Sequence, residues 1–184
     1  MFDVEGFVAQ CQAAIAEVEP RRAIRQVLDR ALADRSAMAD ALKPEEGGLN
    51  TLHRADDLTV LHVVWAPKMK LLPHDHRMWA AIGIYTGQED NAFFRRIAPG
   101  TAPIVASGGK RLAEGDSVLL GDDTIHAVTN PLRQLTGAIH VYGGDFFTQP
   151  RSQWPADLSE ESPHDVEFTR RQFAEANAAW RASQ

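Results

Sequence analysis

The sequence predicts a mainly β protein, in which one β-barrel carries helices at both ends. In residues 1–44, and again near the C-terminus, apolar residues recur at the spacing of a helix face. Between these ends, over residues 49–158, short apolar runs alternate with Pro and Gly turns, as in a series of strands. The 184 residues, of which 44% are hydrophobic, suit one compact domain with a buried core. We therefore expect a single domain over residues 1–184.

The N-terminal segment predicts two helices. Pro20 separates two apolar stripes, and Pro44 with the pair Gly47-Gly48 marks the passage into β structure. The first stripe comprises Phe7, Val8, Cys11, Ile15 and Val18, and the second comprises Ile24, Val27, Leu28 and Leu32. Such stripes are far more often core than cofactor contacts, so we expect these helices to pack on the outside of the barrel.

The central segment predicts strands, and one more helix follows them. Asp165 is a candidate N-cap, and Phe168, Phe173 and Trp180 follow it, so we expect the last helix within residues 163–182. The runs that we expect to form strands are 58–66, 74–85, 92–98, 117–120, 126–129 and 135–142.

Three histidines give the best indication of function. His74 and His76 enclose Asp75, and residues two apart in a strand project from the same face, so both imidazoles can point into a barrel. His126, in the run Thr-Ile-His-Ala-Val, can join them from a distant strand. Neutral imidazole binds iron, copper, nickel and zinc, and three protein ligands leave positions open for substrate and dioxygen. We therefore predict that His74, His76 and His126 bind one metal ion.

Three other histidines lack a second ligand at short spacing. We expect that His53, His62 and His164 do not bind the metal, and that His53 lies nearest to a pocket mouth.

The flanks of the predicted ligands resemble the two motifs of the cupins. Gly87 follows the first pair of histidines, and Gly115 and Asn130 flank His126 at the spacing of the second motif. The resemblance implies a double-stranded β-helix, a jelly-roll barrel. Ala80 stands where most cupins have a glutamate ligand, so three neutral histidines would hold the metal.

A cupin site of three histidines is similar to that of the thiol dioxygenases, the family of cysteine dioxygenase and 3-mercaptopropionate dioxygenase. A neutral triad leaves the metal a stronger Lewis acid toward an anionic thiolate. The resemblance implies a mononuclear non-heme iron dioxygenase that converts a small carboxylate-bearing thiol to its sulfinate with O2. The implied cofactor is Fe(II), and Ni or Zn could replace it in a purified sample.

A second part of the resemblance lies beside the metal ligands. The family has a Ser-x-His-x-Tyr run there, and this chain has Ala138, His140 and Tyr142 at the three positions. Strand alternation places these residues on one face, so the resemblance implies catalytic roles for Tyr142 and for His140 behind it. The alternative is that both residues only fill the barrel with satisfied polar tips.

Two arginines are candidates for binding a substrate carboxylate, because a guanidinium matches two carboxylate oxygens. The tail from Gly143 to Trp154 looks like that of the bacterial 3-mercaptopropionate dioxygenases, and the resemblance makes Arg151 the first candidate. Arg54 is the alternative, because animal cysteine dioxygenases use an arginine in roughly that region.

Departures from the family keep two other functions open. Arg77 directly follows the histidine pair, and the segment 88–96 is not typical of the thiol dioxygenases. The chain could therefore be a metal-dependent cupin enzyme that acts on a non-thiol small molecule. It could also be a non-catalytic cupin that binds a small molecule.

Charge and cysteine content limit the classes of partner that we expect for this protein. A net charge of −6, from 19 basic and 25 acidic residues, argues against a nucleic-acid or anionic-membrane surface. The single cysteine, Cys11, excludes an intramolecular disulfide, and we find no leader peptide or long apolar run. We expect a cytoplasmic protein whose partners are a small thiol and O2, and which could form a homodimer.

Overall fold

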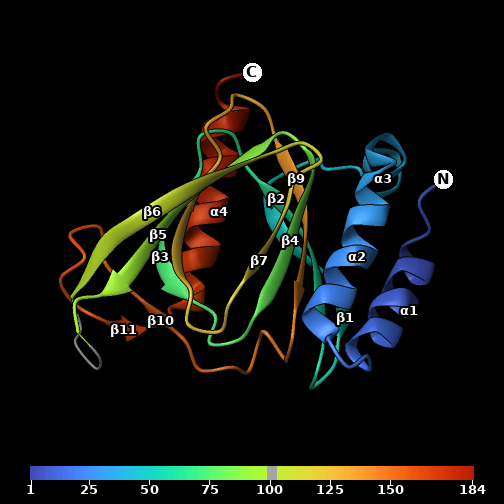
Figure 1. Ribbon diagram of the computed structural model, residues 1–184. Helices are drawn as coiled ribbons and strands as arrows, with labels where there is room; N and C mark the ends of the chain where they lie inside the picture. Colours follow the sequence, from blue (N-terminus) through green and yellow to red (C-terminus); the bar gives the residue numbers. More distant parts are fainter. Residues whose placement is uncertain (99–102) are drawn as a thin grey trace.

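Two antiparallel sheets face each other in the computed structural model, which describes residues 1–98 and 103–184 (Figure 1). The first sheet consists, in spatial order, of β1 (Gly48–Arg54), β2 (Thr59–Trp65), β9 (Thr136–Tyr142), β4 (Ala80–Thr86) and β7 (Ser117–Leu120). The second consists of β11 (Ser162–Pro163), β10 (Ser152–Gln153), β3 (Lys70–Asp75), β8 (Ile125–Thr129), β5 (Gln88–Arg96) and β6 (Ile104–Ala113).

An apolar core lies between the two sheets. The inward side chains of β2 at alternate positions, Leu61, Val63 and Trp65, pack with Leu112 and Val128 of the second sheet. β2 and β9 are buried at every position, because the opposite side of their sheet is covered as well.

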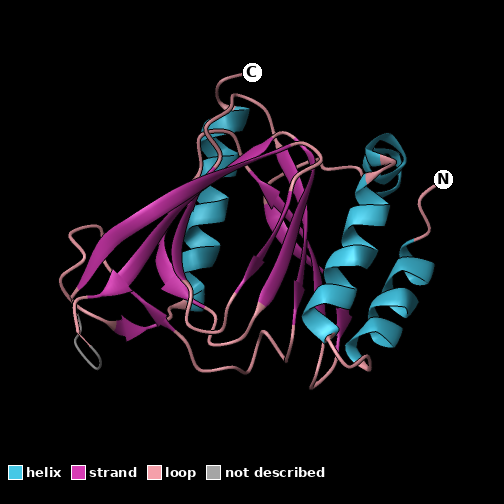
Figure 2. Ribbon diagram, viewed as in Figure 1, coloured by secondary structure: helices cyan, strands magenta, loops and turns pink. Residues whose placement is uncertain are grey.

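The N-terminal helices provide that cover. α1 (Val4–Ile15), α2 (Pro20–Leu32) and α3 (Arg35–Leu42) lie together on one side of the sheets, as Figure 2 shows. The second predicted stripe is confirmed, since its four residues on α2 are all buried. α2 comes closest to β4 at Gly83, where a β-carbon would lie 2.8 Å from side-chain carbons of Leu28 and Leu32. A larger residue at Gly83 would push this helix outward.

The last helix, α4 (Val166–Arg181), lies between the two sheets in the view of Figure 1. Asp165 caps it as predicted, because its side chain accepts a hydrogen bond from a backbone N–H of the first turn. Phe173 stacks on Trp65 with ring centroids 5.5 Å apart. Asn177 accepts from the backbone N of Gly47 at 2.7 Å and donates to its carbonyl O at 2.8 Å. No helix in the described part of the chain has the length and apolarity needed to span a bilayer.

Several elements differ from the prediction. The strand expected over residues 74–85 is two strands, because the chain turns at Arg77, whose φ of 50° is left-handed. Pro20 begins α2 as well as following the first stripe, because proline suits the first position of a helix. Val18 was expected in the first stripe but lies beyond α1 and is exposed. The structure also adds α3, β1 and β6 to the expected elements.

Candidate metal centre

The three predicted ligands meet inside the barrel. His74 on β3 and His126 on β8 are direct cross-strand partners, and His76 directly follows the end of β3. Their ligand atoms all lie within 4.8 Å of one another. All three side chains are buried. The structure therefore gathers His74, His76 and His126 into a group that could hold one metal ion.

Hydrogen bonds behind the cavity orient two of these imidazoles. His74 Nδ1 donates to the carbonyl O of Leu72 at 2.9 Å, and His126 Nδ1 donates to Asn91 Oδ1 at 2.7 Å. His126 Nε2 is buried, and it has no hydrogen-bond partner in the described structure. A metal ion would satisfy this atom, which otherwise carries the cost of burial without a partner. One nitrogen held from behind and the other left free is the usual arrangement of a metal-binding histidine.

Burial keeps these imidazoles neutral. It lowers the pKa of His74 to about 3, and the hydrogen bond that His74 donates to the Leu72 carbonyl only partly opposes this effect. Burial also lowers the pKa of His76 and His126 well below the usual value for histidine, and the neighbouring histidines add to the effect. Only a neutral imidazole has a lone pair for a metal, so the site favours the state that binds one.

β9 brings the predicted His140 and Tyr142 to the same cavity. The Tyr142 hydroxyl lies 3.0 Å from His140 Nδ1, and the Tyr142 ring centroid is 5.1 Å from that of His76. Ala80 pairs in register with Tyr142 on the neighbouring strand and is fully buried. At the position where most cupins are expected to have a carboxylate, this interior therefore has a methyl group.

Arg151 lines the same cavity as the histidines, and its one described side-chain contact is with an aromatic ring. Its guanidinium is 3.8 Å from the centre of the Phe146 ring. Burial lowers the pKa of Arg151, but an arginine keeps its charge in a protein. Within the described residues, this guanidinium has no hydrogen bond or ion pair. A half-buried cation without a hydrogen-bond or ion-pair partner favours an anionic ligand at this position.

The other two arginines near the site already have partners. Arg54 binds the Asp145 carboxylate with two hydrogen bonds, of 3.0 and 2.8 Å, at the cavity mouth. Arg77 lies 3.4 Å from Asp75 and 3.1 Å from Glu161, away from the cavity-lining residues. Of the two carboxylate-binding candidates, Arg151 is the one whose charge is not already neutralised.

The cavity around these residues has a volume of about 590 Å³. His164 lines it, with its ring centroid 6.1 Å from that of His74. The prediction that His53 would lie nearest to the mouth is wrong, because His53 is not among the lining residues and His164 is. No acidic side chain is among the described residues that line the cavity. Apolar groups that line it come from both sheets, from the segment after β9 and from α4, namely Leu49, Val63, Leu71, Val128, Phe146, Phe147, Val166 and Phe173.

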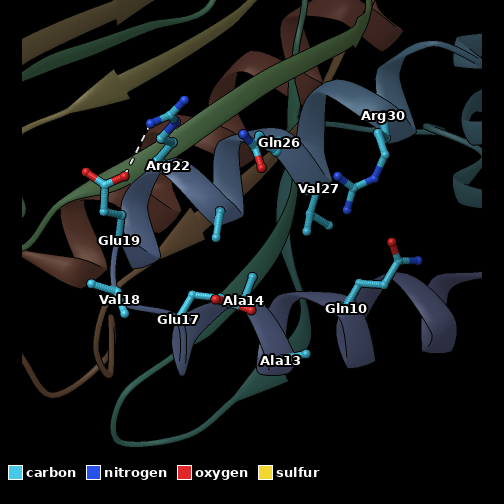
Figure 3. A pocket seen from close by; sticks show the side chains of 11 residues that line it. Gln10, Ala13, Ala14, Glu17, Val18, Glu19, Arg22, Gln26, Val27 and Arg30 are labelled. Atoms are coloured by element: carbon cyan, nitrogen blue, oxygen red, sulfur yellow. Dashed lines mark hydrogen bonds and ion pairs between the residues drawn. The ribbon is translucent and has the colours of Figure 1, made fainter.

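A second hollow, of about 680 Å³, lies between α1 and α2 (Figure 3). Its walls carry flexible polar side chains, among them Gln10, Glu17 and Arg30. Glu19 and Arg22 pair with each other at its edge. None of the predicted site residues is among those described as lining it, so the barrel cavity is the candidate site.

Glu89 and Asn91 belong to the site, although the sequence does not single them out. Both are buried on β5 behind the histidines, and Asn91 Nδ2 donates to Glu89 Oε1 at 2.9 Å. Glu89 Oε2 accepts from Trp65 Nε1 at 2.7 Å. The only signal in the sequence is that positions 89 and 91 share a strand face, and this does not tell whether that face points into the barrel or to solvent. Their segment is the one that departs from the thiol dioxygenases.

Comparisons with known proteins agree with this architecture. No family model matches the chain. BH2720 from Bacillus halodurans has a similar structure, with a TM-score of 0.52 and 13% identity over 73% of this chain and 89% of that one. An RmlC-like cupin family protein from Methanocaldococcus jannaschii, with a double-stranded β-helix fold, gives 0.44 and 11% over 54% of this chain and 82% of that one. The DMSP lyase DddQ from Ruegeria pomeroyi gives 0.41 and 18% over 53% and 43%.

At 13% identity, the likeness to BH2720 shows a shared fold and nothing about activity. This likeness and the two facing antiparallel sheets confirm the predicted barrel architecture. The chain folds as a double-stranded β-helix flanked by helices, and three of its buried histidines could bind a metal ion.

Proposed function

We propose that this protein is a mononuclear non-heme iron dioxygenase that converts a small carboxylate-bearing thiol to its sulfinate with O2. One observation carries the proposal. Three neutral histidines and the unpaired guanidinium of Arg151 line one cavity, and no acidic side chain is among its described lining. Such a cavity favours an anion that has a second group able to bind a metal.

His74, His76 and His126 would hold a ferrous ion, which would supply open coordination positions for a thiolate and dioxygen. Arg151 would bind the substrate carboxylate through a pair of parallel hydrogen bonds and so fix the position of the sulfur. Tyr142 would form a hydrogen bond with the reacting group. The apolar walls would exclude water and strengthen these electrostatic interactions.

The size of the cavity favours a second candidate. A volume of about 590 Å³ is in the range of cavities that hold ligands of drug size, roughly 300–1,000 Å³. A thiol with a three-carbon chain would leave part of it empty. A metal-dependent enzyme acting on a larger, carboxylate-bearing, non-thiol molecule would use the same histidines and the same Arg151.

Oxygen uptake by protein loaded anaerobically with ferrous iron tests the proposal. The panel comprises 3-mercaptopropionate, cysteine, mercaptosuccinate and cysteamine, with sulfinate detected by mass spectrometry. We expect uptake matched by sulfinate for at least one thiol that has a carboxylate, and a much lower rate with cysteamine, which has none. Absence of uptake with the whole panel at full iron occupancy would contradict the thiol proposal and favour the second candidate.

A further inference from the structure

A fully buried carboxylate, Glu89, lies behind both the metal ligands and Tyr142. Its Oε1 accepts from Asn91 Nδ2 at 2.9 Å, and its Oε2 accepts from Trp65 Nε1 at 2.7 Å. The same Oε2 lies 3.5 Å from His140 Nε2, long for a hydrogen bond but close for a charged pair. Burial alone would raise the pKa of Glu89. The nearby His140, together with the amide and indole donors, lowers the pKa instead.

The first contact fixes the hydrogen position on His126. An ionised carboxylate only accepts hydrogen bonds, so the Asn91 amide nitrogen must face Glu89. The Asn91 carbonyl oxygen then faces His126 Nδ1 at 2.7 Å, and that nitrogen must carry the hydrogen. His126 Nε2 is left with its lone pair directed away from Asn91, and it has no partner in the described structure.

The second contact fixes His140. Its Nε2 makes no hydrogen bond in the described structure, but it lies 3.5 Å from the Glu89 carboxylate. The negative charge there favours a hydrogen on Nε2, which leaves Nδ1 as an acceptor. Nδ1 lies 3.0 Å from the Tyr142 hydroxyl, so Tyr142 donates its hydrogen to His140. Ala138, on the same face of the strand, offers no hydroxyl that could compete. The lone pairs of the Tyr142 oxygen remain for the cavity, which Tyr142 lines.

We propose that Glu89 is a positioning residue that sets the hydrogen positions of His126 and His140 and thereby makes Tyr142 a hydrogen-bond acceptor toward the cavity. Because the Tyr142 oxygen then accepts hydrogen bonds from the cavity, the site favours ligands that carry a proton to donate, such as thiols. On the proposed function, the S–H bond breaks and its proton passes to the Tyr142 oxygen, while the Tyr142 O–H proton passes to His140 Nδ1. The imidazolium that results is paired with the Glu89 carboxylate, and the sulfur keeps its electron pair as thiolate.

Nitrogen NMR of protein labelled with 15N-histidine and loaded with zinc, which is diamagnetic, tests the assignment without turnover. The ring signals are assigned with His126→Gln and His140→Gln. We expect the hydrogen on Nε2 of His140 and on Nδ1 of His126. In Glu89→Gln the neutral amide cannot accept from both Asn91 and Trp65 and also offer a negative charge to His140, so we expect altered ring signals for both histidines and about 10- to 100-fold weaker zinc binding. Asp90→Asn is the matched control. It removes one negative charge from the opposite face of the same strand, and it should alter neither the histidine ring signals nor the zinc affinity.

Two results would overturn the proposal. One is a hydrogen on Nδ1 of His140 in the wild-type protein, and the other is Glu89→Gln with unchanged ring signals and zinc affinity. If Glu89→Gln does not fold, Asn91→Ala replaces it, and it should weaken zinc binding while leaving the His140 signals unchanged. If the ring signals are as expected but no thiol is turned over, Glu89 is a positioning residue and the proposed thiol reaction is wrong. If thiols are turned over but His140 carries its hydrogen on Nδ1, the proposed reaction stands and the role of Glu89 is wrong.

Discussion

At the scale of single residues, the site depends on which polar atoms are free and which are already bonded. Arg54 and Arg151 both line the cavity, but Asp145 occupies the guanidinium of Arg54 with two hydrogen bonds. A ligand at Arg54 would have to replace an existing ion pair, whereas a ligand at Arg151 would give a half-buried cation its first ion-pair partner. Arg151 is therefore the stronger candidate for binding a carboxylate.

Replacing Arg151 by Gln should raise KM for the carboxylate-bearing substrate by about 10- to 100-fold, which corresponds to the loss of charge-assisted hydrogen bonds worth about 1.5–3 kcal/mol. Arg54→Gln is the matched control and should change KM much less. Steady-state oxygen uptake measures both variants. A larger effect at Arg54 than at Arg151 would mean that the carboxylate binds at the mouth of the cavity.

The sequence predicts these residues unequally. The His-x-His spacing identifies two ligands because it repeats the period of a strand, and the family-like flanks identify His126. Glu89 could not be predicted in the same way, since one glutamate on a polar strand is usually solvated. Its importance comes from partners on three other residues, Trp65, Asn91 and His140, which only the folded chain brings to it.

At the scale of secondary structure, strand register and one helix build the cavity. The pairing of β3 with β8 sets His74 opposite His126, and a slip of one residue would turn one of them away from the cavity. α4 contributes Val166, Thr169 and Phe173 to the lining. The sequence predicts α4 well because it has an N-cap and a helical apolar period. It does not predict β6, because most positions of that strand are exposed and lack a clear alternation.

Asn177→Ala should loosen α4 from the barrel. The Asn177 side chain is buried and makes two hydrogen bonds with the backbone of Gly47, so its loss leaves an N–H and a C=O without partners, at a cost of about 1–3 kcal/mol. Hydrogen exchange followed by mass spectrometry should show faster exchange in α4 and unchanged exchange in β2 and β9. Arg181→Ala, which removes an exposed ion pair with Glu46, is the control and should change little. Equal exchange in α4 of both variants would contradict this role.

At the scale of the whole molecule, the chain arranges helices, sheet and sheet in layers around one ligand cavity. The fold class can be predicted from the sequence. The helical spacing of apolar residues predicts helices at both ends, and the short apolar runs between turn residues predict strands in the middle. The hollow between α1 and α2 could not be predicted, because it depends on how two helices pack and not on any residue pattern.

The metal-free protein should lose stability as the pH falls below about 6.5. Burial lowers the pKa of His62 and of His164 to about 4 from an ordinary value of 6.5. Between these values the unfolded chain takes up protons that the folded protein does not, so the free energy of unfolding decreases with falling pH. Above the ordinary value both states are neutral and the effect disappears.

Urea unfolding at a series of pH values between about 7 and 5, above the titration range of most carboxylates, measures this dependence. His164→Gln should reduce the slope of stability against pH. A stability that stays constant or rises on acidification over this range would show that the folded protein accepts these protons.

The measurement that tests the three-histidine metal site most directly is ferrous iron content after anaerobic loading and desalting, for the wild-type protein and for His126→Ala. The account predicts about one ion per chain for the wild type, and the loss of most of it in the variant, because two histidines do not complete the site. His53→Ala, outside the cavity, should keep wild-type iron. A His126→Ala protein that keeps the full wild-type iron content would contradict the assignment of His74, His76 and His126 as the ligands.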